Sequence, residues 1–203
     1  MKVFIAIPSM ETVSVDFVIS LERLKRIEQT SVNFAVGSLV YVARDNLASQ
    51  AIMTGSDYIL WLDSDMVFNP YLLIKLMQEI ERGKDFVSGL YFRHSYPYAP
   101  VLYKSVDTGE GFDDYPEEPF EIEGCGFGGV LMKVSMLKDI IDREHAAFAP
   151  LSGYGEDLSF CIRARRCGYR LWCDPRIKLG HVSKTIVTED TYKRKDDPNG
   201  TLR

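Results

Sequence analysis

The sequence predicts an α/β protein with a doubly wound sheet, and two observations carry this prediction. Over the first 90 residues, short apolar runs typical of buried strands alternate with segments whose apolar residues recur at helical spacing. Hydrophobic residues make up 46% of the chain and charged residues 26%, which is the composition of a folded globular protein. Because 203 residues exceed a typical domain only modestly, we expect a single domain.

The first half is expected to supply strands and covering helices in turn. Strands are predicted over residues 2–7, 32–36, 57–62 and 86–90. Pro8 should end the first strand, because proline lacks the N–H that a strand donates to its neighbour. A helix beginning at Ser14 should have an inner face made of Val15, Val18, Leu21 with Phe17, Leu24 and Ile27. Further helices are predicted over residues 40–53 and from Pro70 onwards, with Asn69 as the N-cap.

The second half is richer in Tyr, Pro, Gly and Asp and gives fewer helical signals. Extended segments or strands are expected over residues 101–104, 120–123, 129–133, 169–173 and 176–179, and a turn over residues 109–114. Helices are expected over residues 135–142 and 156–167. The polar tail, residues 183–203, should lack stable structure of its own. Either this tail or the segment 91–118 is interpreted as a lid, since both lie next to sheet ends.

Charge and cysteine content exclude several classes of protein. With 29 acidic and 24 basic residues, the net charge is −5, and no stretch is basic enough to follow a nucleic-acid backbone. No apolar run approaches the roughly 20 residues that cross a bilayer, and the N-terminus lacks the layout of a signal peptide. The cysteines are too irregularly spaced for a disulfide framework or a zinc knuckle. We therefore expect reduced, buried thiols in a cytoplasmic protein, at Cys125, Cys161, Cys167 and Cys173.

The sharpest chemical signal is Asp63-Ser64-Asp65, at the end of the strand predicted over residues 57–62. Ligands of open α/β sheets bind beyond the carboxyl ends of the strands, so a site is expected here. Residues two apart in an extended chain point the same way, and both carboxylates could address one divalent cation, Mg²⁺ or Mn²⁺. The alternative is a capping turn or a loop with solvated acids.

Two further features could complete a site. Glu156 and Asp157 begin the helix predicted over residues 156–167, next to Gly153 and Gly155. A helix N-terminus favours carboxylates, so these acids are either a helix cap or include a general base that takes a proton from a substrate hydroxyl. His181 follows the last predicted strand. It is either a structural histidine or the third ligand of the metal.

Taken in order, these motifs resemble a known family. The order runs through Asp63-Ser64-Asp65, Phe127-Gly128-Gly129-Val130, Gly155-Glu156-Asp157, Gly168-Tyr169-Arg170-Leu171 and His181. It resembles the GT-A fold glycosyltransferases, especially the inverting family-two-like group and the β-1,4-galactosyltransferase-like enzymes. Ala43-Arg44-Asp45-Asn46 is similar to the Ala-Arg-Asn segment of many such enzymes. The resemblance implies one GT-A domain over residues 1–182, with a mixed central sheet flanked by helices, a Rossmann-like nucleotide-binding half (1–90) and an acceptor half (91–182).

The resemblance implies a hexosyltransferase-like, metal-dependent transfer of a sugar from a nucleotide-sugar donor to an acceptor hydroxyl. Mn²⁺ or Mg²⁺, bridging the donor diphosphate, would be held by Asp65 and His181, and Asp63 would contact either the metal or the nucleotide ribose. Asp157 would be the catalytic base and Glu156 an acid that orients the acceptor. The implied contacts to nucleotide and sugar are Pro8, Ser9, Glu11, Arg44, Asp63, Ser64, Gly126, Gly128 and Gly129. The acceptor is left open among glycans, lipid-linked glycans, proteins and small molecules.

Departures from the family pattern refine this expectation. The second predicted strand ends in Ala35-Val36-Gly37-Ser38, without the Asp that reads uracil in many family-two enzymes, so the nucleobase is not assigned. The Gln-x-x-Arg-Trp motif of processive synthases is absent, which favours a single addition. Inversion follows if one displacement occurs, and retention stays open because related metal-dependent folds also retain configuration. The alternatives are a non-catalytic nucleotide or sugar binder and a nucleotidyltransferase, although residues 8–12 lack the Gly and Lys of a nucleotidyltransferase phosphate loop.

Overall fold

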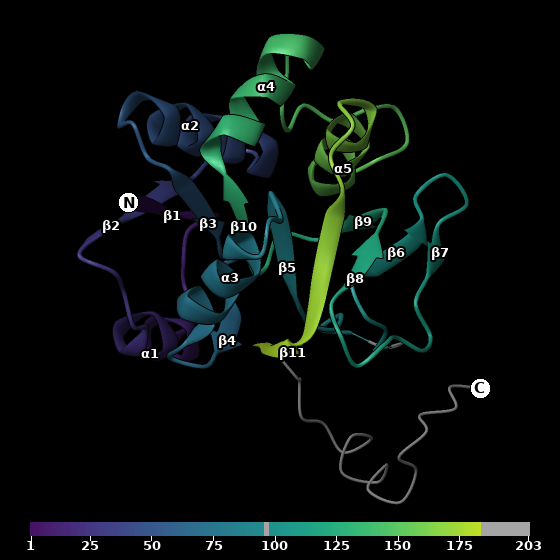
Figure 1. Ribbon diagram of the computed structural model, residues 1–203. Helices are drawn as coiled ribbons and strands as arrows, with labels where there is room; N and C mark the ends of the chain where they lie inside the picture. Colours follow the sequence, from purple (N-terminus) through teal and green to yellow (C-terminus); the bar gives the residue numbers. More distant parts are fainter. Residues whose placement is uncertain (96–97, 184–203) are drawn as a thin grey trace, which may run out of the picture.

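The computed structural model describes residues 1–95 and 98–183, and one mixed β-sheet runs through its centre (Figure 1). The order of its strands is β2-β1-β3-β10-β5-β11-β4, and β8 also pairs with β11. The strands are β1 (Lys2–Ser9), β2 (Gln29–Val36), β3 (Tyr58–Trp61), β4 (Met66–Phe68), β5 (Phe86–Leu90), β8 (Phe120–Ile122), β10 (Val130–Lys133) and β11 (Leu171–His181). The polar tail predicted from residue 183 lies outside the described residues apart from Ser183.

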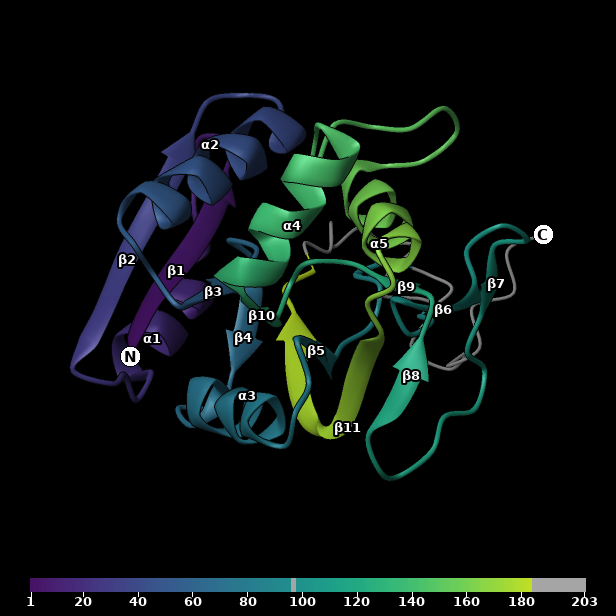
Figure 2. The same ribbon diagram turned by 45° about the horizontal axis from the view of Figure 1, so that its top comes forward.

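Helices cover both faces of the sheet, which gives the molecule three layers (Figures 1 and 2). One face carries α2 (Val40–Met53), α4 (Val134–Glu144) and α5 (Glu156–Arg166), and the other carries α1 (Val15–Arg23) and α3 (Leu72–Glu81). In β1, Phe4 and Ala6 pack on the first face, whereas Ile5 and Ile7 pack on the second. Side chains alternate along a strand, so a strand buried on both faces is apolar throughout. The predicted α/β fold, a mixed sheet flanked by helices, is confirmed.

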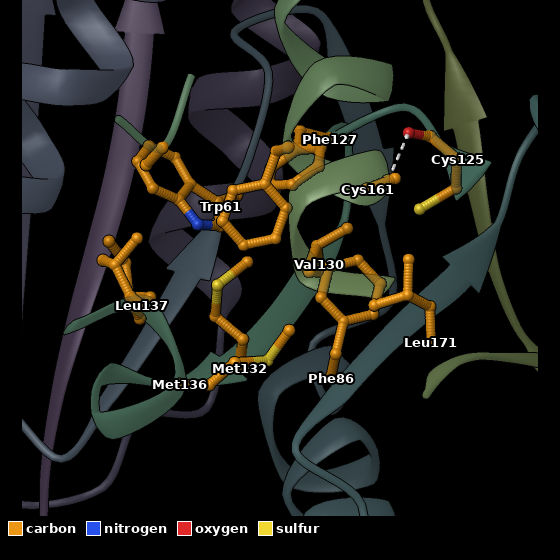
Figure 3. Packing of buried hydrophobic residues seen from close by; sticks show 14 of the residues in the cluster. Trp61, Phe86, Cys125, Phe127, Val130, Met132, Met136, Leu137, Cys161 and Leu171 are labelled. Carbon is orange, nitrogen blue, oxygen red and sulfur yellow. Dashed lines mark hydrogen bonds between the residues drawn. The ribbon is translucent and has the colours of Figure 1, made fainter. Parts of the chain in front are cut away.

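Aromatic rings fill the core between the sheet and helices α2, α4 and α5 (Figure 3). The ring of Phe127 lies edge-on to those of Trp61 and Phe86, with centroids 6.0 Å apart in both pairs. Such pairs stabilise a fold by about 0.5–1.5 kcal/mol beyond the burial of their surface. All four cysteines are free thiols. Cys167 is only partly buried, and the thiols that are buried as predicted are Cys125, Cys161 and Cys173.

Strand β10 makes the sheet mixed. β1 pairs in parallel with β2 and with β3, as the alternation of strands and helices predicts. β10 comes from the second half of the chain and lies antiparallel between β3 and β5. The two halves expected from the sequence therefore share one sheet, and the carboxyl ends of β1, β3 and β5 lie at the same edge.

No helix among the described residues has the length and apolar character that a membrane crossing requires.

The last strand, β11, replaces the two short strands predicted over residues 169–173 and 176–179. It is continuous, but its register against β5 shifts between Asp174 and Lys178. Extra residues of this kind bend a strand without ending it. The first part of β11 pairs with β8 and its end pairs with β4, a strand that the sequence did not predict. This pairing places His181 opposite Met66, next to Asp65.

Pro8 does not end the first strand, contrary to the prediction. Leu62 N–H donates to Ala6 O at 3.1 Å, so Ala6 and every second residue of β1 face β3. Pro8 is two residues beyond Ala6 and faces the same side, where β3 has already ended at Trp61. The missing N–H of Pro8 therefore removes no hydrogen bond between β1 and β3. Strand β1 keeps its register with β2 through Ser9.

Helix α1 is shorter than its apolar pattern predicted, and it buries Phe17 and Leu21 of the predicted face but not the two valines. It ends at Arg23, and the predicted inner residues Val15 and Val18 are 73% and 45% exposed. The residues of α1 that are buried are Phe17, Ser20 and Leu21. The aromatic ring and the leucine lie on one stripe of the helix, and that stripe prevails over the smaller valines because it buries more apolar surface.

Helix α3 starts later than predicted, at Leu72 instead of Pro70. The Asn69 side chain accepts the N–H of Tyr71 at 2.9 Å, so it holds a turn before the helix and does not cap it.

Beyond the central sheet, a smaller sheet has the order β7-β6-β9. Its strands are β6 (Leu102–Ser105), β7 (Glu110–Gly111) and β9 (Gly124–Cys125). It lies at the outer side of β8 (Figure 1).

Candidate active site

A pocket of about 460 Å³ opens where the carboxyl ends of β1, β3 and β5 meet. Ligand sites of open α/β sheets lie at this edge. Ten residues singled out from the sequence line the pocket: Pro8, Ser9, Arg44, Asp63, Ser64, Asp65, Gly126, Glu156, Asp157 and His181. The pocket therefore lies at the edge of the sheet where the sequence predicted a site.

Three residues singled out from the sequence do not line this pocket: Glu11, Gly128 and Gly129. Glu11 is exposed on the loop after β1. The two glycines are buried, and their lack of a side chain serves packing. A Cβ on Gly129 would lie 2.5 Å from the Leu179 side chain, and one on Gly128 would lie 3.0 Å from the Tyr91 ring. These glycines let β11 and Tyr91 approach the segment that leads into β10.

Arg44 on α2 joins the acids that follow β3 to those that begin α5. Its Nη2 donates to Asp63 Oδ1 at 2.9 Å and its Nε to Glu156 Oε1 at 3.3 Å. Only 3% of the Arg44 side chain is exposed, and its guanidinium lies 5.6 and 5.2 Å from the ring centroids of Trp61 and Phe127. We call Arg44 with its two acids the Arg44 clamp. Asp63 is thus paired with an arginine, where the resemblance implied a metal or the ribose.

Asp65 pairs with His181 across β4 and β11. Asp65 Oδ2 lies 3.2 Å from His181 Nε2, and His181 Nδ1 lies 3.1 Å from Phe92 O. Burial alone would raise the pKa of Asp65, but the hydrogen bond and charge of His181 outweigh burial and lower it. The hydrogen bond with Asp65 in turn raises the pKa of His181, against the opposing effect of burial. The pair is therefore a charged carboxylate beside an imidazole that favours its protonated form.

These two side chains suit a divalent cation that also binds phosphate, once the imidazole has given up its proton, because only a neutral histidine binds a metal. A carboxylate oxygen and an imidazole nitrogen face each other, and the second ring nitrogen of His181 meets a backbone carbonyl, which is the usual outer partner of a metal-binding histidine. No group of three or more His, Cys, Asp or Glu side chains within residues 1–95 and 98–183 is arranged to hold a metal. Mg²⁺ and similar ions are often held by one or two protein ligands together with substrate phosphates and water.

Asp157 and Glu156 lie in the first turn of α5 but have different surroundings. Glu156 is held by Arg44. Asp157 has no such partner; burial, followed by the negative charge of Glu156, raises its pKa from 3.8 to about 6, and the N–H of Leu158 opposes this rise only in part. A helix cap would not require a buried carboxylate of this kind, since the N-cap residue is Gly155. Asp157 is therefore available to accept a proton near neutral pH.

The loop that leads into α5 is fixed by side chains of α2 and α5. Phe148 N–H donates to Asp45 Oδ1 at 3.1 Å, and Leu151 N–H donates to Ser159 Oγ at 2.8 Å. Ser159 Oγ donates in turn to Gly155 O at 2.7 Å. Since α2 carries both Asp45 and the arginine of the clamp, one helix positions the start of α5 in two ways. The two acids are thereby held at a defined place on the pocket wall.

Four pocket residues that directly follow β5 were missed by the sequence analysis: Tyr91, Arg93, His94 and Ser95. The rule that singled out Asp63 could have found them, because the strand predicted over residues 86–90 ends at the same sheet edge. Arg93 N–H donates to Ala99 O at 3.0 Å, and Ser183 Oγ donates to His94 O at 2.8 Å. The segment is therefore bonded to Ala99, before β6, and to Ser183, just after β11.

Comparison with known proteins assigns the chain to a family. The family model for "Glycosyl transferase family 2" matches residues 26–141, more than half of the chain. The protein belongs to glycosyl transferase family 2. Family membership supports glycosyltransferase activity and identifies the mixed sheet and its helices as the GT-A fold. The matched residues of this family 2 protein include Arg44 and Asp65 and end before Asp157 and His181.

One solved structure supports the same fold for this family 2 protein. "Crystal Structure of A197 from STIV" is similar over 91% of this chain and 87% of that chain, with a TM-score of 0.68 and 23% sequence identity. At this identity the likeness shows the fold alone. No curated protein sequence matches the chain. The likeness to β-1,4-galactosyltransferase-like enzymes remains an expectation from the motifs.

Proposed function

We propose that the protein transfers a sugar from a nucleoside diphosphate sugar to an acceptor hydroxyl, with inversion and with one divalent cation held by Asp65 and His181. The observation that carries this proposal is the state of two carboxylates in one pocket. The pKa of Asp65 is lowered beside His181, whereas the pKa of Asp157 is raised to about 6. Environments that separate the pKa values of two acids commonly divide their roles. The charged carboxylate of Asp65 suits the binding of a cation, and the carboxylate of Asp157 suits the acceptance of a proton.

The proposed reaction is one displacement at the anomeric carbon. The acceptor oxygen forms the new bond, its proton passes to Asp157, and the bond to the nucleoside diphosphate breaks on the opposite face, so the configuration inverts. Glu156, held by Arg44 at 3.3 Å, orients the acceptor. The bound cation supplies positive charge that stabilises the diphosphate leaving group. Pro8 and Ser9, at the carboxyl end of β1, line the part of the pocket that suits the nucleoside.

The direct test incubates the protein with Mn²⁺ and, separately, with UDP-glucose, UDP-galactose, UDP-N-acetylglucosamine and GDP-mannose. Slow release of UDP or GDP, with water as the acceptor, is the expected result. Two results would contradict the proposal. A binder would show a raised melting temperature without release, and a nucleotidyltransferase would release pyrophosphate from a nucleoside triphosphate and a sugar phosphate.

Asp65→Asn is expected to abolish the part of UDP or GDP affinity that depends on Mn²⁺. The substitution replaces a charged oxygen ligand by a neutral amide, while His181→Ala should weaken the same affinity less because the carboxylate remains. Isothermal titration with and without Mn²⁺ measures this effect independently of turnover. Asp85→Asn, which changes a partly exposed acid paired with Lys133 outside the pocket, is the matched control. Equal Mn²⁺ enhancement in Asp65→Asn and wild type would remove Asp65 from the metal site.

Arg93→Ala is expected to weaken UDP or GDP binding by about tenfold, the loss of one charge-assisted contact. Arg93 lines the pocket and is exposed, and no acid in the described part of the chain pairs with it. The guanidinium of Arg44, in contrast, is already bound to Asp63 and Glu156. Arg23→Ala, on the exposed side of α1, is the control. Binding that weakens equally in both variants, or in neither, would argue against a phosphate contact at Arg93.

A further inference from the structure

Tyr91 follows β5 directly and lies in the pocket wall with its hydroxyl inside the protein. Only 3% of the residue is exposed, yet it lines the pocket. Gly128 N–H donates to Tyr91 Oη at 3.2 Å. A phenol oxygen can accept such a bond and still donate its own hydrogen. The protein therefore uses this hydroxyl as an acceptor.

The donor role of the hydroxyl is not used within residues 1–95 and 98–183, where the bond from Gly128 is the one hydrogen bond that the Tyr91 hydroxyl makes. Buried polar groups in native proteins nearly always have a partner, which is either protein, water or ligand. Tyr91 is part of the pocket lining. A molecule bound in the pocket can therefore supply an acceptor for this hydrogen.

Two glycines of the run over residues 124–129 form a cradle for this phenol. A Cβ on Gly126 would collide with Tyr91 Oη, and a Cβ on Gly128 would lie 3.0 Å from Tyr91 Cζ. Phe127, between them, is buried in the aromatic core, which anchors the cradle. The motifs led us to expect these glycines to line the pocket for sugar and acceptor, and Gly126 does line the pocket. Both glycines also fix the position of the Tyr91 hydroxyl.

The cradle places Tyr91 among the reactive groups of the pocket. Its ring lies edge-on to the His181 ring, with centroids 5.9 Å apart. Burial, followed by the negative charge of Asp63, raises the pKa of Tyr91 well above its usual range, and Asp157 adds to this rise. The hydroxyl consequently keeps its proton at all working pH values. It can donate a hydrogen bond but cannot act as a base.

We propose that Tyr91 binds the transferred sugar, donating its O–H to a hydroxyl oxygen of that sugar. This inference rests on the proposed function, which takes the diphosphate to lie at Asp65 and the acceptor to lie at Asp157. The transferred sugar lies between those two ends, against Tyr91. The bond from Gly128 N–H strengthens the donation, because a hydroxyl that accepts one hydrogen bond is a better donor of another.

Tyr91→Phe tests the proposal, since it removes the hydroxyl and keeps the ring in its cradle. Affinities are measured in Mn²⁺ for UDP and GDP and for the four nucleotide sugars named above. The nucleotide sugar that wild type binds most tightly should bind about fivefold to tenfold more weakly, the loss of one hydrogen bond. UDP and GDP, which lack the sugar, should bind as before. Tyr103→Phe, a partly buried tyrosine of β6 outside the pocket, is the matched control.

A second variant reaches the same contact from the cradle. Gly126→Ala displaces the Tyr91 hydroxyl and should reproduce the selective loss of nucleotide-sugar affinity. If Tyr91→Phe weakens UDP, GDP and nucleotide sugars equally, or weakens none of them, Tyr91 does not bind the sugar and the proposed function still stands. If wild type binds neither the nucleoside diphosphates nor the nucleotide sugars, the proposed function fails and this inference fails with it.

Discussion

Asp157→Asn is expected to lower the turnover of the proposed transfer by about 10² to 10⁴ while the affinity for the nucleotide sugar stays nearly unchanged. Asparagine keeps the shape of the side chain and can still accept the N–H of Leu158, which donates to Asp157 Oδ1 at 2.7 Å. It cannot take a proton from the acceptor. Release of UDP or GDP under single-turnover conditions gives the rate, and equilibrium titration gives the affinity.

Glu156→Gln is the matched variant, because it changes the neighbouring acid in the same way. If Glu156→Gln shows the selective loss of turnover and Asp157→Asn loses donor binding, the two acids have exchanged roles. If neither substitution slows release, the acids serve only the start of α5. The base would then be sought at Asp113 and Asp114, which are exposed in the segment before β8.

The same substitution has a second expected readout, because the raised pKa of Asp157 affects stability as well as rate. Below about pH 6 the base is protonated, so kcat/KM of wild type should fall there. The carboxyl has a pKa of about 6 in the folded chain and about 3.9 in an unfolded chain. Its contribution to stability is therefore full below about pH 4 and is lost as the pH rises through 6.

A pKa difference of about two corresponds to roughly 3 kcal/mol of folding free energy. Asp157→Asn removes this buried charge, so at pH 8 the variant should unfold at a higher urea concentration than wild type. The gap between the two midpoints should close towards pH 4. A gap that is the same at both pH values would show that the charge of Asp157 does not strain the fold.

Arg44→Met is expected to lower the free energy of unfolding by about 3 kcal/mol, because removing one partner of a buried ion pair leaves its acids uncompensated. The side chains of Asp63 and Glu156 are only 32% and 17% exposed, so water can replace the arginine only in part. Methionine keeps the apolar contact with the aromatic rings. Urea unfolding at pH 7 without nucleotide measures the loss through the midpoint.

Arg143→Met is the control for this measurement. Arg143 pairs with Asp139 at 3.3 Å, but the two side chains are 50% and 40% exposed. Exposed pairs of this kind contribute less than about 1 kcal/mol. Equal, small losses in Arg143→Met and Arg44→Met would mean that the Arg44 clamp does not hold the two acidic segments together.

The sequence predicted the sheet edge and ten of the pocket-lining residues because local rules govern both. A buried apolar strand delivers Asp63-Ser64-Asp65 to its carboxyl end, and a glycine-led helix start carries Asp157. The partners of these acids could not be read in the same way. Arg44 meets Glu156 only because α2 and α5 cover the same face of the sheet, and the Tyr91 hydroxyl is positioned by glycines that lie later in the chain. Long-range contacts of this kind leave no periodic signal.

The errors in the predicted bounds of α1 and β11 have the same cause, which is long-range packing. The end of α1 and the face that it buries depend on which stripe of side chains meets the sheet, and that choice is made by the sheet. The continuity of β11 depends on β5, β8 and β4, each of which pairs with a different part of it. In each case the local pattern allows more than one outcome and tertiary packing selects one.

The position of β10 has a consequence for how the chain folds as it is made. β3 and β5 both belong to the first 90 residues, but the strand that separates them spans Val130–Lys133. Until that segment leaves the ribosome, both strands present open backbone edges, and such edges pair readily with other chains. The half of the sequence that looks like a nucleotide-binding unit is therefore not a unit of folding. His181 emerges later still, so the Asp65–His181 pair forms only after nearly the whole described chain has been synthesised.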